Sequence, residues 1–159
     1  MKHFPQGIKV AVLHDPNAAP TGDGNAINVG TAQDIFVVVN ADVEGSGALE
    51  IHPERGNAAE GFVALANNAN IWVCANTAAT DALVRQNDGT SFNTAAAAVN
   101  VMVVMRINPD SLGNHTAGDN LPCDRFRVRL VQGNASDVAS VVAYLVPRYQ
   151  QESVPEVRV

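Results

Sequence analysis

The sequence is short of charge and of aromatic side chains. Charged residues make up 16% and aromatic residues 5% of the 159 residues, whereas an average globular protein has roughly 25% charged residues. The formal net charge is −6, and this excludes nucleic acid as the main partner because phosphate binding needs a concentrated basic field. The surface must then consist largely of Asn, Ser, Thr, Gly and Ala. Such a surface costs little to desolvate, which favours large permanent contacts.

Long hydrophobic runs are also missing. No stretch of about eighteen apolar residues occurs, so no membrane span is expected. Residues 1–7 lead into no apolar run of the kind found in a signal peptide, which predicts synthesis in a host bacterial cytoplasm. Cys74 and Cys123 are the only cysteines. Cys74, in an apolar run, is expected to be buried, and Cys123, between a loop and a strand, to be more exposed. Whether the two thiols meet stays open.

Motifs that carry chemistry are absent as well. The four histidines, His3, His14, His52 and His115, never share the spacing of a metal site. The loop Gly22–Asn25 lacks the bidentate glutamate of a calcium loop. Neither a Gly-x-Ser-x-Gly elbow nor a phosphate-binding glycine motif is present. We therefore predict that the protein is not an enzyme, with no catalytic, cofactor-binding or metal-binding residues and no cofactor.

What the sequence does contain is a strand pattern near its end. Phe126, Val128 and Leu130 alternate with arginines, as in a strand that is half in a core and half in water. After the turn at 132–136, residues 138–146 carry no charge on either face. Such a strand must be covered on both faces, by its own core and by a neighbouring sheet, segment or subunit. The two strands and their turn predict a hairpin.

Short strands recur through the rest of the chain at about ten-residue intervals. Besides the two already described, they are expected at 8–13, 35–39, 48–51, 62–65, 71–75, 82–85 and 94–107. Turns at 44–47 and 67–70 predict two further hairpins, whereas 14–25 and 53–57 are expected to be irregular. The pattern predicts an all-β, antiparallel β-sandwich, a jelly roll of about eight strands. We expect a single domain over 1–159, with an arm and first strand at 1–33, a body at 34–147 and an extended tail at 148–159.

The chain resembles the small jelly-roll decoration (cement) proteins of tailed bacteriophage capsids. The resemblance covers most of the chain and depends on its core of small residues, on the segment 43–50, and on 124–129 leading into 143–146. It implies a structural virion protein, often a homotrimer, that lies on the outer capsid surface and bridges subunits of the major capsid protein. It implies no catalytic residues, and no nucleic acid or membrane partner is expected.

The ends of the chain are the expected contact segments. They bury little apolar surface of their own, and each carries a few anchors. The predicted partner-binding residues are Phe4, Ile8, Tyr149, Val154 and Val157.

Two alternatives stay open. One is a carbohydrate- or receptor-binding β-sandwich of a phage tail or fibre, and the other is an enzyme whose site the sequence does not reveal. Sugar-binding sandwiches stack exposed aromatic rings on sugars. Trp72 and Tyr144 are expected to be packed, and Tyr149 to be exposed.

Overall fold

A computed structural model describes residues 8–18, 21–116 and 120–148, and these residues form twelve strands and one short 3-10 turn, η1 (Pro109–Ser111). The strands are β1 (Lys9–Ala18), β2 (Gly22–Asp23), β3 (Ile27–Asn28), β4 (Ala32–Val43), β5 (Glu50–Asn57), β6 (Gly61–Ala64), β7 (Asn70–Cys74), β8 (Val84–Arg85), β9 (Phe92–Asn93), β10 (Val99–Ile107), β11 (Arg125–Val131) and β12 (Val138–Pro147). Within these residues no helix is long and apolar enough to span a membrane.

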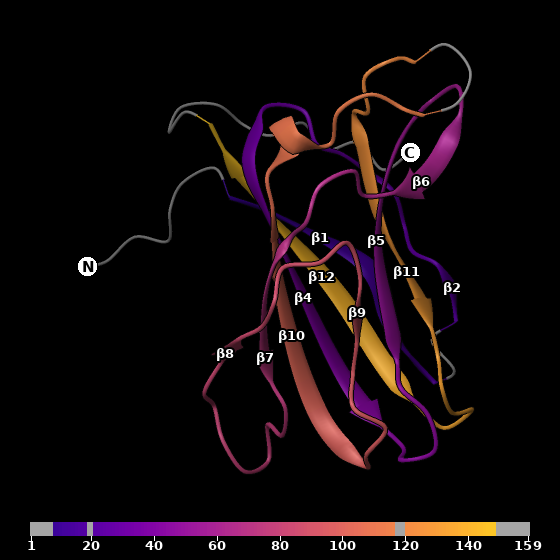
Figure 1. The fold of residues 1–159 in the computed structure, drawn as a ribbon, viewed down its shortest axis with the longest axis vertical. Helices are drawn as coiled ribbons and strands as arrows, with labels where there is room; N and C mark the ends of the chain where they lie inside the picture. The colour runs from indigo at the N-terminus through magenta and orange to yellow at the C-terminus, as the bar shows by residue number, and fades with distance from the viewer. Residues whose placement is uncertain (1–7, 19–20, 117–119, 149–159) are drawn as a thin grey trace.

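The strands form two antiparallel sheets that pack face to face (Figure 1). Sheet A has the order β1-β12-β4-β10-β7-β8, and sheet B has the order β2-β11-β5-β6, with β3 also pairing with β11 and β9 with β5. The four-stranded sets β1-β12-β4-β10 and β2-β11-β5-β6 have the pairing of a jelly roll, in which the first strand lies beside the last. The predicted all-β sandwich is therefore confirmed.

Alternating side chains build the core between the sheets. Phe126, Val128 and Leu130 of β11 are completely buried, and the arginines between them point outward. Sheet A supplies the opposite half of the core through the inward residues of its central strands, namely Ile35, Val37, Val39, Val101, Val103, Met105, Ala139, Val141, Ala143 and Leu145. Full burial of each large apolar side chain contributes about 1.5–3 kcal/mol. The layer between the sheets therefore holds the fold together.

The predicted hairpins are wrong, although their strands are present. The strands β4 and β5, β6 and β7, and β11 and β12 lie in opposite sheets, so each of these connections crosses the sandwich instead of pairing its flanking strands. A short turn fixes only the local direction of the chain. The apolar face of each strand then selects its partner, and in this fold the partners are distant in sequence.

Two segments expected to be irregular are strands. The first is the start of 14–25, because β1 continues to Ala18 and β2 follows. Register shifts in the β1–β12 pairing on either side of His14 interrupt the ladder, and Pro16 is accommodated because β1 is an edge strand. Conversely, the alanines at 95–98, expected to start a strand, form a bend before β10.

The second such segment is 53–57, which lies within β5. Pro53 is opposite Val128 of β11, whose carbonyl oxygen accepts from the Gly24 N–H on the other side at 2.9 Å. Pro53 and Val128 are thus a pair without mutual hydrogen bonds, and the nitrogen of Pro53 faces away from β11. On that side β6 pairs only with 54–57 and β9 only with 50–51. The missing N–H of Pro53 therefore faces a gap in the ladder and costs no bond.

Two of the crossing turns are locked together at one end of the sandwich. The buried carboxylate of Asp137 accepts hydrogen bonds from the backbone N–H groups of Glu44 (2.9 Å), Gly133 (3.1 Å) and Asn134 (3.0 Å). The backbones of Gly47 and Gly133 also touch, since a Cβ on Gly47 would lie 2.5 Å from the Gly133 oxygen. The β4–β5 and β11–β12 connections therefore depend on each other.

Replacing this carboxylate should destabilise the whole domain. We expect Asp137→Ala to lower the free energy of unfolding by about 3 kcal/mol, because three backbone N–H groups lose a buried, charged acceptor. Asp81→Ala, at an exposed aspartate, is the matched control and should have little effect. Urea unfolding followed by circular dichroism measures both. A loss below about 1 kcal/mol for Asp137→Ala would show that the turns do not depend on this contact.

Candidate interaction surfaces

The outer face of sheet A is apolar across five strands. One row of cross-strand neighbours consists of Val12, Val142, Val38, Val104 and Trp72, on β1, β12, β4, β10 and β7. All five are half-buried, whereas the inward residues beside them on the same strands are buried, except Ala11, which is partly buried. No segment among the described residues therefore covers this row. With their neighbours they form what we call the apolar face, made of Val10, Val12, Phe36, Val38, Trp72, Met102, Val104, Val142, Tyr144 and Val146.

The apolar face bears directly on the prediction for 138–146. The inner side of β12 is covered by the core, as expected, but its outer side, with Val142 and Tyr144, is only half-buried. Trp72 and Tyr144, expected to be packed, lie half-buried on this face as well. Val10 next to Tyr144 is 50% exposed. The sequence predicts that the outer side of β12 is covered as well as the inner side. The described part of this chain does not cover that outer side.

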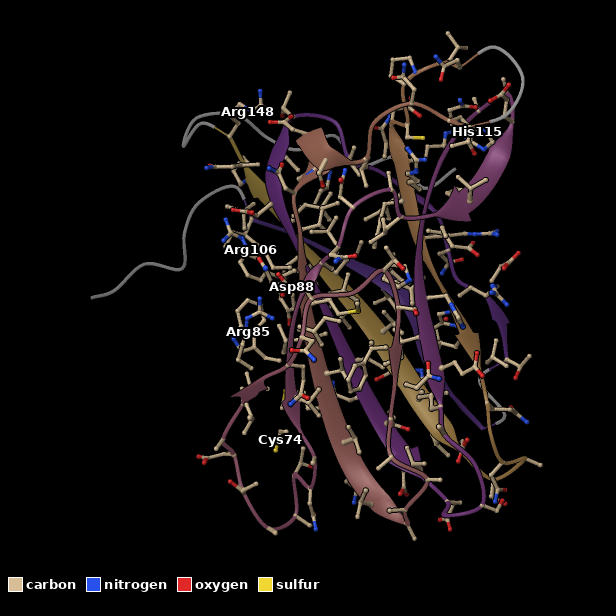
Figure 2. The ribbon with its side chains drawn as sticks, viewed as in Figure 1. Cys74, Arg85, Asp88, Arg106, His115 and Arg148 are labelled. Carbon is tan, nitrogen blue, oxygen red and sulfur yellow. The ribbon has the colours of Figure 1, made fainter. Side chains whose placement is uncertain are left out.

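Two arginines near the apolar face are paired with carboxylates. The Arg106 Nε donates to Asp34 at 2.8 Å, and this contact raises the pKa of the guanidinium above its usual value. Arg85 stacks over the Trp72 ring at 4.9 Å and pairs with Asp88, which lowers the pKa of that carboxyl. Figure 2 shows Arg85 and Arg106 on the same flank of the molecule. These two arginines beside the face are therefore neutralised by carboxylates of the same chain.

A polar hollow lies at one end of the apolar face. It has a volume of about 190 Å³, and its lining includes Asn40, Asp42, Asn100 and Ser140, from β4, β10 and β12. Thr77 also lines the hollow, and its backbone N–H donates to the Asn100 carbonyl oxygen at 2.8 Å. The hollow gives this end of the face amide, carboxylate and hydroxyl groups that a polar ligand could contact.

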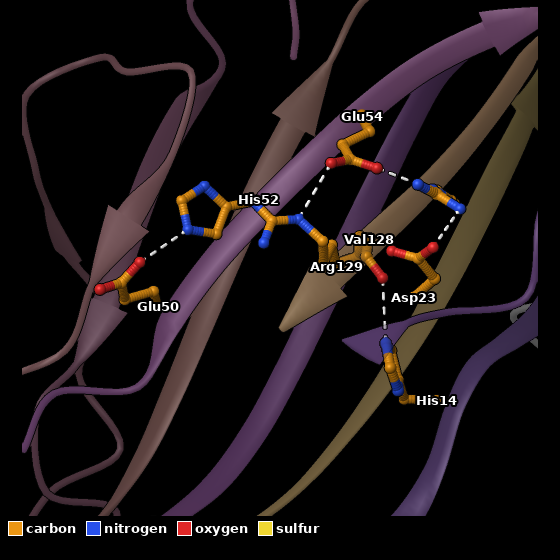
Figure 3. Close-up of polar contacts among 8 residues, drawn as sticks. His14, Asp23, Glu50, His52, Glu54, Val128 and Arg129 are labelled. Carbon is orange, nitrogen blue, oxygen red and sulfur yellow. Dashed lines mark hydrogen bonds and ion pairs between the residues drawn. The ribbon is translucent and has the colours of Figure 1, made fainter. Parts of the chain in front are cut away.

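The outer face of sheet B differs from that of sheet A, because it carries charged side chains that neutralise one another (Figure 3). Glu54, only 9% exposed, accepts from Arg127 Nε at 2.7 Å and from Arg129 Nε at 3.1 Å. The same Arg127 donates to Asp23 at 2.7 Å and lies 4.3 Å from the centre of the Phe62 ring. Arg127 and Arg129 are therefore balanced by acidic neighbours and offer no basic field.

A buried polar cluster occupies the end of the sandwich opposite the locked turns. Arg55, 4% exposed, donates to the carbonyl oxygens of Leu112, Asn114 (2.6 Å) and Ala64 (3.2 Å). His115, near β6 in Figure 2, is also buried, and its Nδ1 lies 2.8 Å from the Glu60 carboxylate. The cluster anchors the connection between β10 and β11 to the body and was not predicted from the sequence, because its partners are mostly carbonyl groups.

The structure describes both cysteines, Cys74 and Cys123. Both are free and buried, and Cys123, at 8% exposed, is slightly more exposed than Cys74, at 1%, as expected. The backbone N–H of Cys123 donates to the Gly113 carbonyl oxygen at 2.8 Å, and this hydrogen bond holds Cys123 in place. Burial raises the pKa of the Cys123 thiol, and nearby Arg55 opposes this only in part. A thiol with a raised pKa is a poor nucleophile at neutral pH.

Of the predicted partner-binding residues, the structure describes only Ile8, which is half-buried just before β1. Phe4, Tyr149, Val154 and Val157 lie outside the described residues. Among the residues that are described, no group of three or more His, Cys, Asp or Glu side chains is placed to hold a metal ion. The apolar face was missed as a site because it is assembled from five strands, and only one of them, 138–146, looked unusual in the sequence.

Comparison with known proteins finds one similar fold. No protein-family model matches the chain, and no curated protein matches it. Among solved structures, the crystal structure of the SPBc2 prophage-derived protein YomS is similar, with a TM-score of 0.51 at 15% sequence identity. The match covers 87% of this chain and 92% of that chain. At this identity the similarity shows a shared β-sandwich fold.

The thiols should be unreactive in the folded protein. We expect both to react with a disulfide reagent at pH 7 at least about tenfold more slowly than in the unfolded chain, because burial hinders access and keeps Cys123 protonated. The reaction is followed by absorbance, and the chain in guanidinium chloride is the control. Rapid reaction of one thiol in the native protein would show that a cysteine is accessible.

Proposed function

We propose that the protein is a structural component of a bacteriophage particle that decorates the outer capsid surface and stabilises it by bridging major capsid protein subunits. The observation that carries the proposal is the apolar face, a five-strand surface that the described chain leaves without a cover. Contiguous apolar patches on a protein surface mark sites of protein contact. The prophage origin of the similar fold supports a phage setting.

The stabilising effect would come from contact area. Many copies on a shell each add a modest interface, and their combined effect resists expansion or rupture. Self-association, in the trimer that the resemblance implies or in another form, and binding to the major capsid protein are both part of this proposal. The anchors Phe4, Ile8, Tyr149, Val154 and Val157 would supply contacts with the shell.

A direct test uses purified protein and DNA-free shells of the major capsid protein from the same genome. We expect saturable co-sedimentation with shells. Phe4→Ala should weaken it about tenfold or more, since one buried apolar anchor contributes about 1.5–3 kcal/mol. Lys2→Ala in the same segment is the matched control. Wild-type protein that stays in the supernatant would contradict the proposal.

A carbohydrate- or receptor-binding protein of a phage tail or fibre is the second candidate, and the polar hollow favours it. Asn40, Asp42 and Asn100 lie on neighbouring strands and could hydrogen-bond the hydroxyl groups of a sugar. Among the described residues, the lining of the hollow includes no aromatic ring on which a sugar could stack.

Titration with a panel of monosaccharides separates the two candidates. Under the capsid proposal we expect no saturable shifts in the NMR spectrum at millimolar sugar. Binding that is lost in Asp42→Ala, and kept in the control Asp81→Ala, would instead support the receptor-binding candidate.

A further inference from the structure

A second hollow lies at the end of the sandwich that holds the buried polar cluster. It has a volume of about 360 Å³, which is within the range of pockets that bind small ligands. Two segments form it, the end of β5 with the turn that follows and the chain just before β11. Its lining consists of Asn57, Ala58, Ala59, Leu121, Pro122 and Asp124. The walls are therefore mostly apolar, with one amide and one carboxylate among them.

The amide of Asn57 is a buried donor without a partner. Asn57 is only 6% exposed, and its Oδ1 accepts from the backbone N–H groups of Ala59 at 3.0 Å and Glu60 at 2.8 Å. These two hydrogen bonds fix the orientation of the amide. Its Nδ2 has no hydrogen-bond partner among the described residues. Because buried donors in folded proteins are nearly always paired, the hollow beside Asn57 is the place where a ligand can supply the acceptor.

We infer that the second hollow binds a short extended segment of another protein, with a peptide carbonyl oxygen accepting from Asn57 Nδ2. An apolar side chain of that segment would lie against Leu121 and Pro122. A peptide fits better than a sugar, since the walls are apolar and include no aromatic ring among the described residues. A free anion fits poorly beside the carboxylate of Asp124. This inference goes beyond the capsid proposal and does not depend on it.

Asp124 indicates which residue should accompany the apolar one in the bound segment. Its carboxylate is exposed, and Arg125 Nε lies 3.9 Å from its Oδ1, which is beyond hydrogen-bond distance. The carboxylate therefore keeps acceptor capacity for a donor on the ligand. A neighbouring arginine or lysine in the segment would be attracted to Asp124, whereas a glutamate would be repelled.

The walls of the hollow are held in place before a ligand arrives. The backbone N–H of Asp124 donates to the Gly56 oxygen at 3.1 Å, which ties the segment before β11 to β5. The backbone N–H of His115 donates to the Leu121 oxygen at 2.8 Å, and this bond holds the same segment from the other side. A preformed site loses little conformational entropy when it binds, so a short peptide can bind measurably.

NMR titration of the full chain with two blocked dipeptides tests this inference. Acetyl-Leu-Arg-methylamide should bind saturably, with a dissociation constant of about 1 mM or lower, and should shift the side-chain amide signals of Asn57. Acetyl-Leu-Glu-methylamide should bind about threefold more weakly, because contacts with an exposed carboxylate contribute little. Equal binding of the two peptides would overturn the role given to Asp124.

Asn57→Asp tests the donor directly, because it keeps the oxygen that accepts from the turn and replaces only the Nδ2 group. We expect it to bind the Leu-Arg peptide about tenfold more weakly. Asn76→Asp is the matched control. Asn76 also caps a turn, with its Oδ1 accepting from the Ala78 N–H at 3.1 Å, but it does not line the second hollow. This control should bind as the wild type does.

Leu121→Ala tests the apolar wall and keeps the inference falsifiable if Asn57→Asp does not fold, which circular dichroism checks. Leu121 is 46% exposed, so its truncation leaves the core intact, and we expect about fivefold weaker binding or more. Leu83→Ala is the control, since Leu83 is 45% exposed and lies outside the hollow. Leu83→Ala should not change the affinity.

Three results would overturn the inference. The first is the absence of saturable binding of either peptide at millimolar concentrations, which would mean that water alone satisfies the Asn57 amide. The second is binding that folded Asn57→Asp and Leu121→Ala leave unchanged. The third is a monosaccharide that shifts the Asn57 amide signals when the peptides do not. The shell assay above is independent of these outcomes, because it uses a different partner and different variants.

Discussion

The layer of side chains between the two sheets is the interaction on which the rest of this structure depends. Strands that follow each other along the chain are mostly not paired, and β4, β10 and β12 alternate with strands of the opposite sheet. Neighbouring strands in sequence are thus joined chiefly by the core between them, where Phe126 and Val141 are completely buried. The turns can only be short because this packing keeps the sheets close. The hydrogen bonds to Asp137 then fix two of these turns relative to each other.

The same architecture leaves two outer faces with different chemistry. On sheet B, Glu54 lies between Arg127 and Arg129, so its charge is neutralised without help from another molecule. Such a surface is stable in water by itself. On sheet A the exposed side of the central strands is apolar, and water is a poor solvent for it. The difference between these faces directs the functional interpretation toward assembly through sheet A.

The location of most of the longer strands could be predicted from the sequence, because alternation of apolar and polar residues is a local property. The alternation at 126–131 and the apolar runs at 35–39 and 138–146 all correspond to observed strands. Pairing could not be predicted in the same way. Glycine and asparagine at 44–47 and 132–136 indicate a reversal of the chain, and a reversal is equally compatible with a hairpin and with a crossing between sheets. The choice depends on contacts between residues about ninety positions apart, such as that of Glu44 with Asp137.

The sequence by itself therefore determined the fold class, the weakness of any basic field, and the presence of a late strand without charge on either face. These follow from composition and from the period of two residues, which each segment carries independently. Only the tertiary structure decided that Val12, Val38, Val104, Val142 and Trp72 form one continuous row. Their alignment arises from the register of four strand pairs, and register is set by the burial of the opposite faces of those strands in a common core.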